Sequence, residues 1–129
     1  MKKLLATLAC ALFASVALAG EYPDISISEL EEAIKKGEVI VIDVNGSSSY
    51  EKGHIPGAID FRANKDNIAT LLGDKKDKLV VAYCGGPTCN AYKAGAKAAE
   101  EAGFKNIKHL SAGISGWLQA GKETEKPKS

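Results

Sequence analysis

Two almost unbroken apolar runs, "VIVIDV" at 39–44 and "KLVVAY" at 78–83, constrain the fold more than any other feature of the chain. Both are rich in β-branched or large apolar residues and lack the alternation of a strand with one wet face, so each predicts a strand covered on both faces. Helical patterns separate the two runs. This order predicts βαβ units with right-handed crossovers, and therefore a parallel sheet with helices on both faces.

Shorter segments complete this pattern. "DISI" at 24–27 predicts a short strand, and 28–37 predicts a helix in which Ser28 and Glu31 have the spacing of a capping box and Gly37 ends the helix. The later predicted elements are a short helix at 47–53, a strand at 58–61, a helix at 64–73, a long helix through Ala102, a strand at 106–110 and a closing helix at 113–121. The expected fold class is α/β, a parallel sheet of about five strands flanked by helices on both faces.

The N-terminus has the pattern of a secretory signal peptide. Two lysines precede an apolar run that ends in "ALAG" at 17–20, an A-x-A cleavage pattern. The run is shorter than the roughly 20 apolar residues of a membrane span, and an uncleaved anchor is the alternative. We expect export, to the periplasm or another exported location, with residues 1–19 removed. A domain at 20–120 and a flexible, charged tail at 121–129 would remain.

The charge of the chain argues against two classes of partner. The chain has 17 basic and 16 acidic side chains and a net charge of +1. Cleavage after Ala19 would remove Lys2 and Lys3 and no acidic residue, so the mature chain would carry a net charge of −1. This balance gives no electrostatic basis for binding nucleic acid or, after cleavage, an anionic membrane. The sequence does not define an oligomeric state.

A cysteine loop, "CGGPTCN" at 84–90, follows the second apolar run. Parallel sheets bind ligands beyond the carboxyl ends of their strands, so this run delivers Cys84 to the expected site. Glycines and the start of the next helix let backbone N–H groups turn inward, where they can hold a thiolate, a persulfide or a substrate oxyanion. The loop residues concerned are Gly85, Gly86, Pro87, Thr88, Cys89 and Asn90. An inert, buried cysteine in an ordinary turn is the alternative.

Three segments, "VIDVNGSSSYEKGHIPGAIDF", "VVAYCGGPTCN" and "AGFKNIKHLSAGISGW", resemble the rhodanese (sulfurtransferase) family in content and order. They cover nearly all of the chain after residue 19. The resemblance implies a sulfurtransferase in which Cys84 takes sulfane sulfur from thiosulfate or a related donor, carries it as a persulfide and passes it to a thiol or cyanide, without a cofactor. It also implies a structural role for His54, and we expect Asp43 to order the adjacent loop.

The chain departs from the family pattern around the site. Asn45 stands where the Asp-Val pair is usually followed by Arg, and the loop after Cys84 is longer than the common short form and has no Arg or Lys. Donor binding would then rest on backbone amides, with Arg62 and Lys93 as candidate anion contacts. Asn90 occupies the position of the Arg in the Cys-x5-Arg loop of phosphatases and arsenate reductases, which argues against that chemistry.

Several roles of Cys89 stay open. It can be a resolving thiol that attacks oxidised or persulfidated Cys84 and closes a reversible disulfide, as in a thiol-disulfide redox protein. It can also be half of a permanent disulfide, or a small residue at the helix start. Metal binding with Cys84 and His109 matches zinc spacings poorly, so we expect no metal. A non-catalytic binding module is a further alternative, motivated by Asn45 and the loop without Arg.

Overall fold

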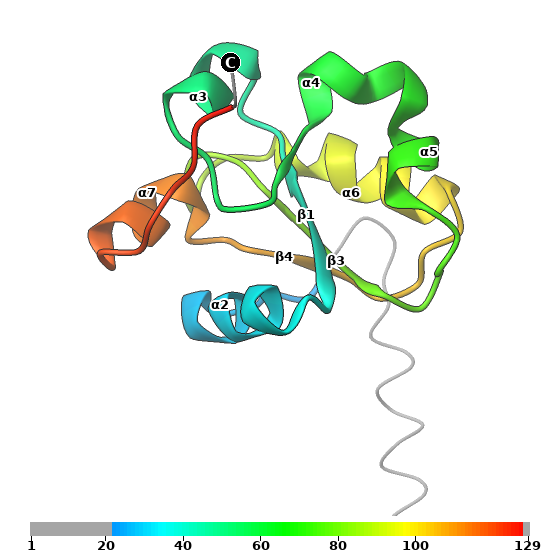
Figure 1. Cartoon of the computed structure of the whole chain (residues 1–129), viewed down its shortest axis with the longest axis horizontal. Helices are drawn as coiled ribbons and strands as arrows, with labels where there is room; N and C mark the ends of the chain where they lie inside the picture. Colours follow the sequence, from blue (N-terminus) through cyan, green and yellow to red (C-terminus); the bar gives the residue numbers. More distant parts are fainter. Residues whose placement is uncertain (1–21, 128–129) are drawn as a thin grey trace, which may run out of the picture.

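The two apolar runs form the central strands of a parallel sheet, β1 (Val39–Asp43) and β3 (Leu79–Tyr83), which pair along their whole length (Figure 1). The computed structural model describes residues 22–127, so the predicted signal peptide lies outside the described residues. The shorter strands β2 (Ile59–Asp60) and β4 (Ile107–His109) flank them in the order β2-β1-β3-β4, all parallel. The α/β class is confirmed, with four strands in the described part instead of about five.

The segment predicted as the additional strand, 24–27, forms only a single bridge between Asp24 and His109. Its strand prediction is wrong because helix α2 (Ile27–Lys36) begins there, capped by Ser26. The Ser26 hydroxyl accepts from the Glu29 N–H (3.1 Å), and the Glu29 carboxylate accepts from the Ser26 N–H (3.2 Å). The capping box therefore lies two residues before the predicted pair, and Gly37 ends the helix as predicted, at φ 68°.

The remaining helical segments are α3 (Ser47–Lys52), α4 (Phe61–Asn64), the 3₁₀ turn η1 (Lys65–Asn67), α5 (Ile68–Leu72), α6 (Tyr92–Glu101) and α7 (Gly113–Gln119). The helix predicted at 64–73 is thus divided into three short pieces and starts earlier. Its start is set by Asp60, whose side chain caps α4 by accepting from the Ala63 N–H (3.4 Å). The same cap shortens the strand predicted at 58–61.

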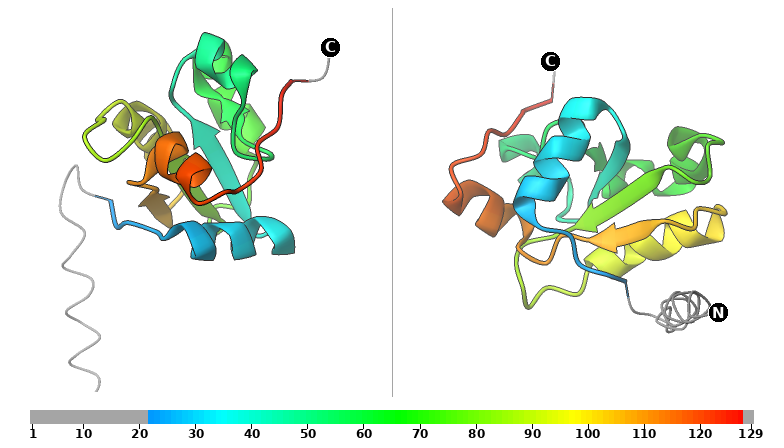
Figure 2. Two further views of the ribbon diagram at one scale, coloured as in Figure 1. Left: turned by 90° about the vertical axis from the view of Figure 1, so that its left-hand side faces the viewer. Right: turned by 90° about the horizontal axis from the view of Figure 1, so that it is seen from below.

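The two faces of the sheet are covered by different helices. Val81 and Tyr83 of β3 pack in one apolar layer with residues of α2 and α7. Val80, Ala82 and Cys84 pack in the other layer with residues of α4, α5 and α6. Figure 2 shows α2 and α6 on opposite sides of the sheet. Because strand side chains alternate in direction, the consecutive residues Tyr83 and Cys84 belong to different layers.

The residues after α7 run back along the domain toward α3 (Figure 1). The Trp117 indole donates to the Glu123 carbonyl (2.7 Å), and Lys122 pairs with Glu31 (2.9 Å). Glu125 exchanges two backbone hydrogen bonds with His54 (2.8 and 2.9 Å). The start of the expected tail, 121–129, is therefore tied to the domain through Glu125, and its flexibility stays a prediction.

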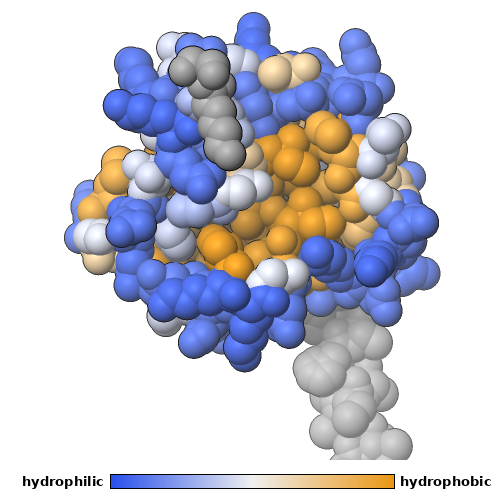
Figure 3. All heavy atoms as spheres, in the orientation of Figure 1, coloured by the Kyte–Doolittle hydropathy of each residue, from blue (hydrophilic) through white to orange (hydrophobic). Residues whose placement is uncertain are grey.

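The surface has an apolar area over β1, surrounded by hydrophilic residues (Figure 3). Strand β2 pairs with only Ile42 and Asp43 of β1, so within residues 22–127 the start of β1 has no strand on that side. In the same part of the chain, no helix combines the length and apolarity needed to cross a bilayer.

Candidate functional site

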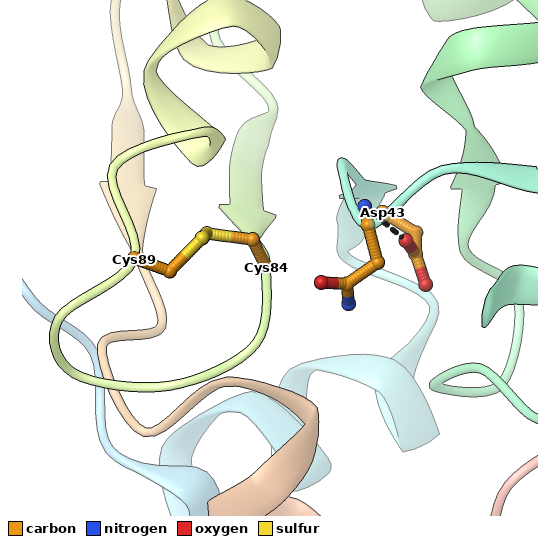
Figure 4. Close-up of a disulfide and its surroundings, with 4 residues drawn as sticks. Asp43, Cys84 and Cys89 are labelled. Atoms are coloured by element: carbon orange, nitrogen blue, oxygen red, sulfur yellow. Dashed lines mark hydrogen bonds between the residues drawn. A yellow bond between two sulfur atoms is a disulfide. The ribbon is translucent and has the colours of Figure 1, made fainter.

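Cys84 lies directly after β3, at the carboxyl end of the sheet, and is 1% exposed. It forms a disulfide with Cys89, so the two cysteines of the loop are joined (Figure 4). A turn closed by the Cys89 N–H and the Gly86 carbonyl (3.1 Å) folds the intervening residues back. Cys89 is less buried than Cys84, and Pro87 and Thr88 at the tip are exposed.

Helix α7 holds the first part of the loop. The N–H groups of Ile114 and Ser115 donate to the carbonyls of Cys84 and Gly85, both at 3.0 Å. Gly113 has a φ of 62°, and a Cβ added there would lie 2.5–2.6 Å from Gly85 and Gly86 backbone atoms. This role of Gly113 was not predicted from the sequence, although a glycine at the first position of the predicted closing helix was the available signal.

These contacts set the direction of the loop amides. In a trans peptide the C=O and N–H groups point in opposite directions. Because the Cys84 and Gly85 carbonyls face α7, the N–H groups of Gly85 and Gly86 face away from α7, whose residues pack in the layer opposite to that of Cys84. Within the described residues, the N–H groups of Gly85, Gly86, Thr88 and Asn90 have no hydrogen-bond partner.

Helix α6 approaches the sheet closely just beyond the loop. A Cβ on Gly95 would lie 2.8 Å from Val44 and 3.1 Å from Ile42, so only glycine permits this distance. The helix begins at Tyr92 after Ala91, with no side-chain cap. In its first turn the N–H groups of Lys93 and Ala94 donate to the carbonyls of Asn90 and Ala91 (both 3.1 Å), so backbone hydrogen bonds join the start of α6 to the end of the cysteine loop.

Asn45 follows β1 and faces the loop. Its Oδ1 lies 3.8 Å from the position that a Cβ on Gly85 would take. Its Nδ2 is buried and has no hydrogen-bond partner in the described part of the chain. The position at which the sequence departs from the family pattern thus places a neutral amide with an unused donor beside the cysteine loop.

On the opposite layer, Asp43 and Tyr83 form a closed hydrogen-bonded group. The Tyr83 hydroxyl donates to Asp43 Oδ2 and accepts from the Ile55 N–H (3.1 Å), and Asp43 Oδ1 accepts from the Asn45 N–H (2.8 Å). Burial raises the pKa of the Asp43 carboxyl above its ordinary value, against the opposing effect of these hydrogen bonds. Burial and the neighbouring Asp43 also raise the pKa of Tyr83. Figure 4 shows the Asp43 carboxyl directed away from the disulfide.

His54 is buried on the same side as Asp43. Its Nδ1 lies 2.9 Å from the Tyr50 carbonyl, its ring stacks on Tyr50 with centroids 3.6 Å apart, and its Nε2 lies 3.7 Å from the Glu125 carboxylate. None of these partners belongs to the cysteine loop. The contacts tie helix α3 to the residues after α7.

The two candidate anion contacts are not drawn into the loop. The side chains of Arg62 on α4 and Lys93 on α6 are exposed and make no hydrogen bond or ion pair with a residue in 22–127. Lys93 takes part through its backbone only, donating to the Asn90 carbonyl (3.1 Å). The polar groups that the structure brings next to Cys84 are therefore neutral.

His109, considered above as a metal ligand, lies at the end of β4. Its ring stacks on Tyr92 with centroids 3.4 Å apart, and burial lowers its pKa. Among residues 22–127, no three His, Cys, Asp or Glu side chains lie together as they would around a metal ion.

Fold and site together define a class of protein: a parallel α/β domain whose central strand ends in a cysteine, followed by a loop with N–H groups that have no partner within residues 22–127. The family model of the rhodanese-like domain matches residues 26–120, and the chain belongs to this family.

Similar proteins carry this domain in several settings. An HTH-type transcriptional regulator of Mycobacterium tuberculosis is 36% identical over 99 residues, which are 75% of this chain and 42% of the regulator. A tRNA uridine(34) hydroxylase of Photorhabdus laumondii is 32% identical over 114 residues, 84% of this chain and 31% of the hydroxylase. The chain thus spans less than half of either relative. The thiosulfate sulfurtransferase GlpE of Shewanella oneidensis is 29% identical over 102 residues, 77% of this chain and 95% of GlpE.

Solved structures show the same fold. The BH2092 protein of Bacillus halodurans is 32% identical, with a TM-score of 0.66 and coverage of 94% of this chain and 86% of that protein. A thiosulfate sulfurtransferase of Pseudomonas aeruginosa is 25% identical, with a TM-score of 0.70 and coverage of 84% of this chain and 20% of that protein.

Proposed function

We propose that the chain is a sulfurtransferase that moves sulfane sulfur, from thiosulfate or a related small donor, through a persulfide on Cys84. The observation that carries this proposal is the set of N–H groups in the loop after β3, at Gly85, Gly86, Thr88 and Asn90, that have no partner within residues 22–127. Such groups stabilise an anionic sulfur without a nearby base. The names of GlpE and of the Pseudomonas aeruginosa enzyme give thiosulfate as a donor for members of this fold.

The reaction has two displacements. The Cys84 thiolate attacks the outer sulfur of thiosulfate, the sulfur–sulfur bond of the donor breaks, and sulfite leaves with its electron pair. A thiol or cyanide acceptor then attacks the outer sulfur of the persulfide, and Cys84 leaves as the thiolate. The loop amides hold the anionic sulfur before and after each displacement.

Two features of the site shape this function. Cys84 is bonded to Cys89, so the disulfide must be reduced before the first displacement. The Nδ2 group of Asn45 supplies a neutral donor beside the loop in place of a cation. We expect thiosulfate, a dianion, to gain less from this site than an organic thiosulfonate, whose anion carries a single negative charge.

Thiocyanate formation from cyanide tests the proposal, with thiosulfate, polysulfide and an organic thiosulfonate as donors. Reduced wild-type protein is expected to turn over with at least one donor. Cys84→Ser is expected to form thiocyanate at least about a hundredfold more slowly than wild type. Thr70→Ser, a substitution at an exposed position on α5, is expected to keep the wild-type rate. Failure of reduced wild type with every donor, or full activity in Cys84→Ser, would refute the proposal.

Export is a second part of the proposal and rests on the signal-peptide pattern at 1–19. In a host with an outer membrane, the full chain is expected in the periplasmic fraction with Gly20 as its first residue. Mature protein that retains Met1, or that stays in the cytoplasm, would contradict export.

A thiol-disulfide redox function is the alternative that a specific observation favours, namely the Cys84–Cys89 disulfide. Equilibration of the pair in glutathione buffers decides it. A midpoint potential close to that of the compartment would support a redox role. A much lower potential would mark the bond as permanent, and would also require a strong reductant before any sulfur transfer.

A further inference from the structure

The disulfide shows which sulfur of a persulfide Cys89 can reach. Cys89 Sγ is bonded to Cys84 Sγ, the atom that would be the inner sulfur of a Cys84 persulfide. The turn between the Gly86 carbonyl and the Cys89 N–H (3.1 Å) brings Cys89 back to this atom. The loop therefore has a conformation in which the sulfur of Cys89 contacts the inner sulfur of a Cys84 persulfide. External acceptors, by contrast, attack the outer sulfur.

We propose that Cys89 resolves the Cys84 persulfide and releases hydrogen sulfide, so that the chain acts as a sulfane-sulfur reductase when a dithiol is available. This inference rests on the proposed persulfide, and concerns where the sulfur goes after it is bound.

The resolving step balances without a further reactant. The Cys89 thiolate attacks the inner sulfur, and its electron pair forms the Cys84–Cys89 bond. The bond between the inner and outer sulfurs breaks, and the outer sulfur leaves as hydrosulfide, which takes a proton to become hydrogen sulfide. The outer sulfur is reduced and the Cys89 sulfur is oxidised. The protein product is the disulfide form described above.

The loop favours this step over transfer to an outside thiol. Only four residues separate the cysteines, so the attack is intramolecular and does not depend on the concentration of an acceptor.

The accessibility of the two cysteines also sets how the enzyme is restored. Cys84 is 1% exposed, while Cys89 is only partly buried. An external dithiol therefore attacks Cys89, and Cys84 leaves as the thiolate next to the unpaired loop amides. The second thiol of the reductant then attacks the reductant sulfur of this mixed disulfide, and the bond to Cys89 breaks. The reductant leaves as its own disulfide and Cys89 as the thiolate, so both cysteines are free for another cycle.

A single-turnover experiment on the reduced protein tests the inference. The reductant is removed, one equivalent of polysulfide or thiosulfate is added without cyanide or thiol, and sulfide and intact mass are measured. Wild type is expected to release about one equivalent of sulfide and to lose two hydrogen atoms in mass. Cys89→Ser is expected to keep one added sulfur atom and to release sulfide at least about tenfold more slowly. Thr70→Ser serves as the matched control and is expected to behave as wild type.

The outcomes separate the inference from the proposed function. Wild type that keeps the added sulfur, or Cys89→Ser that releases sulfide as fast as wild type, would overturn resolution by Cys89 and leave the persulfide carrier intact. If neither wild type nor Cys89→Ser gains sulfur or releases sulfide with any donor, the persulfide itself is refuted, and resolution with it.

Discussion

The two sides of the sheet's carboxyl edge use their polar groups in opposite ways. On the α2 and α7 side, Asp43, Tyr83 and the Ile55 N–H satisfy one another, and the carboxyl is 1% exposed. On the α6 side, loop N–H groups and Asn45 Nδ2 have no partner within residues 22–127. Tyr83 and Cys84, consecutive in sequence, begin these two arrangements.

The difference shows how the same edge of the sheet can stabilise the fold on one face and offer donors for an anion on the other. Burial raises the pKa of Asp43, so its side of the edge disfavours a negative charge. The unpaired donors on the other side favour one. A closed network stabilises the end of β1, while the buried Asn45 Nδ2 beside the loop costs stability unless a ligand accepts from it.

The largest effect is expected where α7 meets the loop. Gly113→Ala places a Cβ 2.5–2.6 Å from the Gly85 and Gly86 backbone at a φ of 62°, and is expected to lower the free energy of unfolding by about 4 kcal/mol. Gly121→Ala is the matched control, because Gly121 has a φ of 76° with nothing within 4 Å. Both variants place alanine at a positive φ, so the difference between their losses of unfolding free energy in urea measures the cost of the steric contact alone. Equal losses would show that α7 does not constrain the loop.

A smaller loss is expected from the closed network. Tyr83→Phe leaves the Asp43 carboxyl and the Ile55 N–H buried without this partner, and should cost about 3 kcal/mol while leaving the loop in place. Tyr22→Phe, which removes a hydrogen bond to Glu100 at the surface, should cost less than about 1 kcal/mol. Similar losses in the two variants would mean that the network is not a special source of stability.

The raised pKa of Asp43 gives a pH dependence of known sign. The folded state holds the proton more tightly than the unfolded state, so this contribution to stability is complete below the ordinary Asp pKa of about 3.9 and is lost as pH rises through the raised value. The advantage of wild type over Asp43→Asn should therefore shrink as pH rises through this window. Unfolding free energies of both proteins measure it, and a growing advantage would contradict the raised pKa.

The smallest effect is expected at the residues after α7. Glu125→Ala removes the carboxylate that accepts from the Gly57 N–H (3.0 Å) and lies near His54, and should cost under about 1 kcal/mol because the side chain is half exposed. Glu123→Ala is the control, since Glu123 contributes a backbone carbonyl to Trp117. If thermal unfolding shows a larger loss of stability for Glu123→Ala than for Glu125→Ala, the proposed role of the Glu125 carboxylate is contradicted.

Part of this arrangement could be predicted from the sequence. The runs at 39–44 and 78–83 predicted the buried strands, because continuous apolar segments have one stable place in such a fold. The start of α2 was misplaced because Ser26 and Ser28 both have a glutamate three residues later, and only tertiary packing chooses between them. The hydrogen bonds between α7 and the loop join residues about 30 positions apart, and the local sequence signals them only through one glycine, Gly113. The bond between Cys84 and Cys89 needed the loop conformation, which spacing does not specify.

The central claim is that reduced Cys84 is a thiolate held by the loop amides. Its direct test is the rate at which reduced Cys89→Ser reacts with iodoacetamide as pH is varied. The unpaired amides predict a half-maximal rate at least about one pH unit below the ordinary cysteine value of about 8.5, whereas apolar burial alone would move it upward. The same profile for Cys89 in Cys84→Ser should stay near the ordinary value. A midpoint for Cys84 at or above about 8.5 would contradict the account.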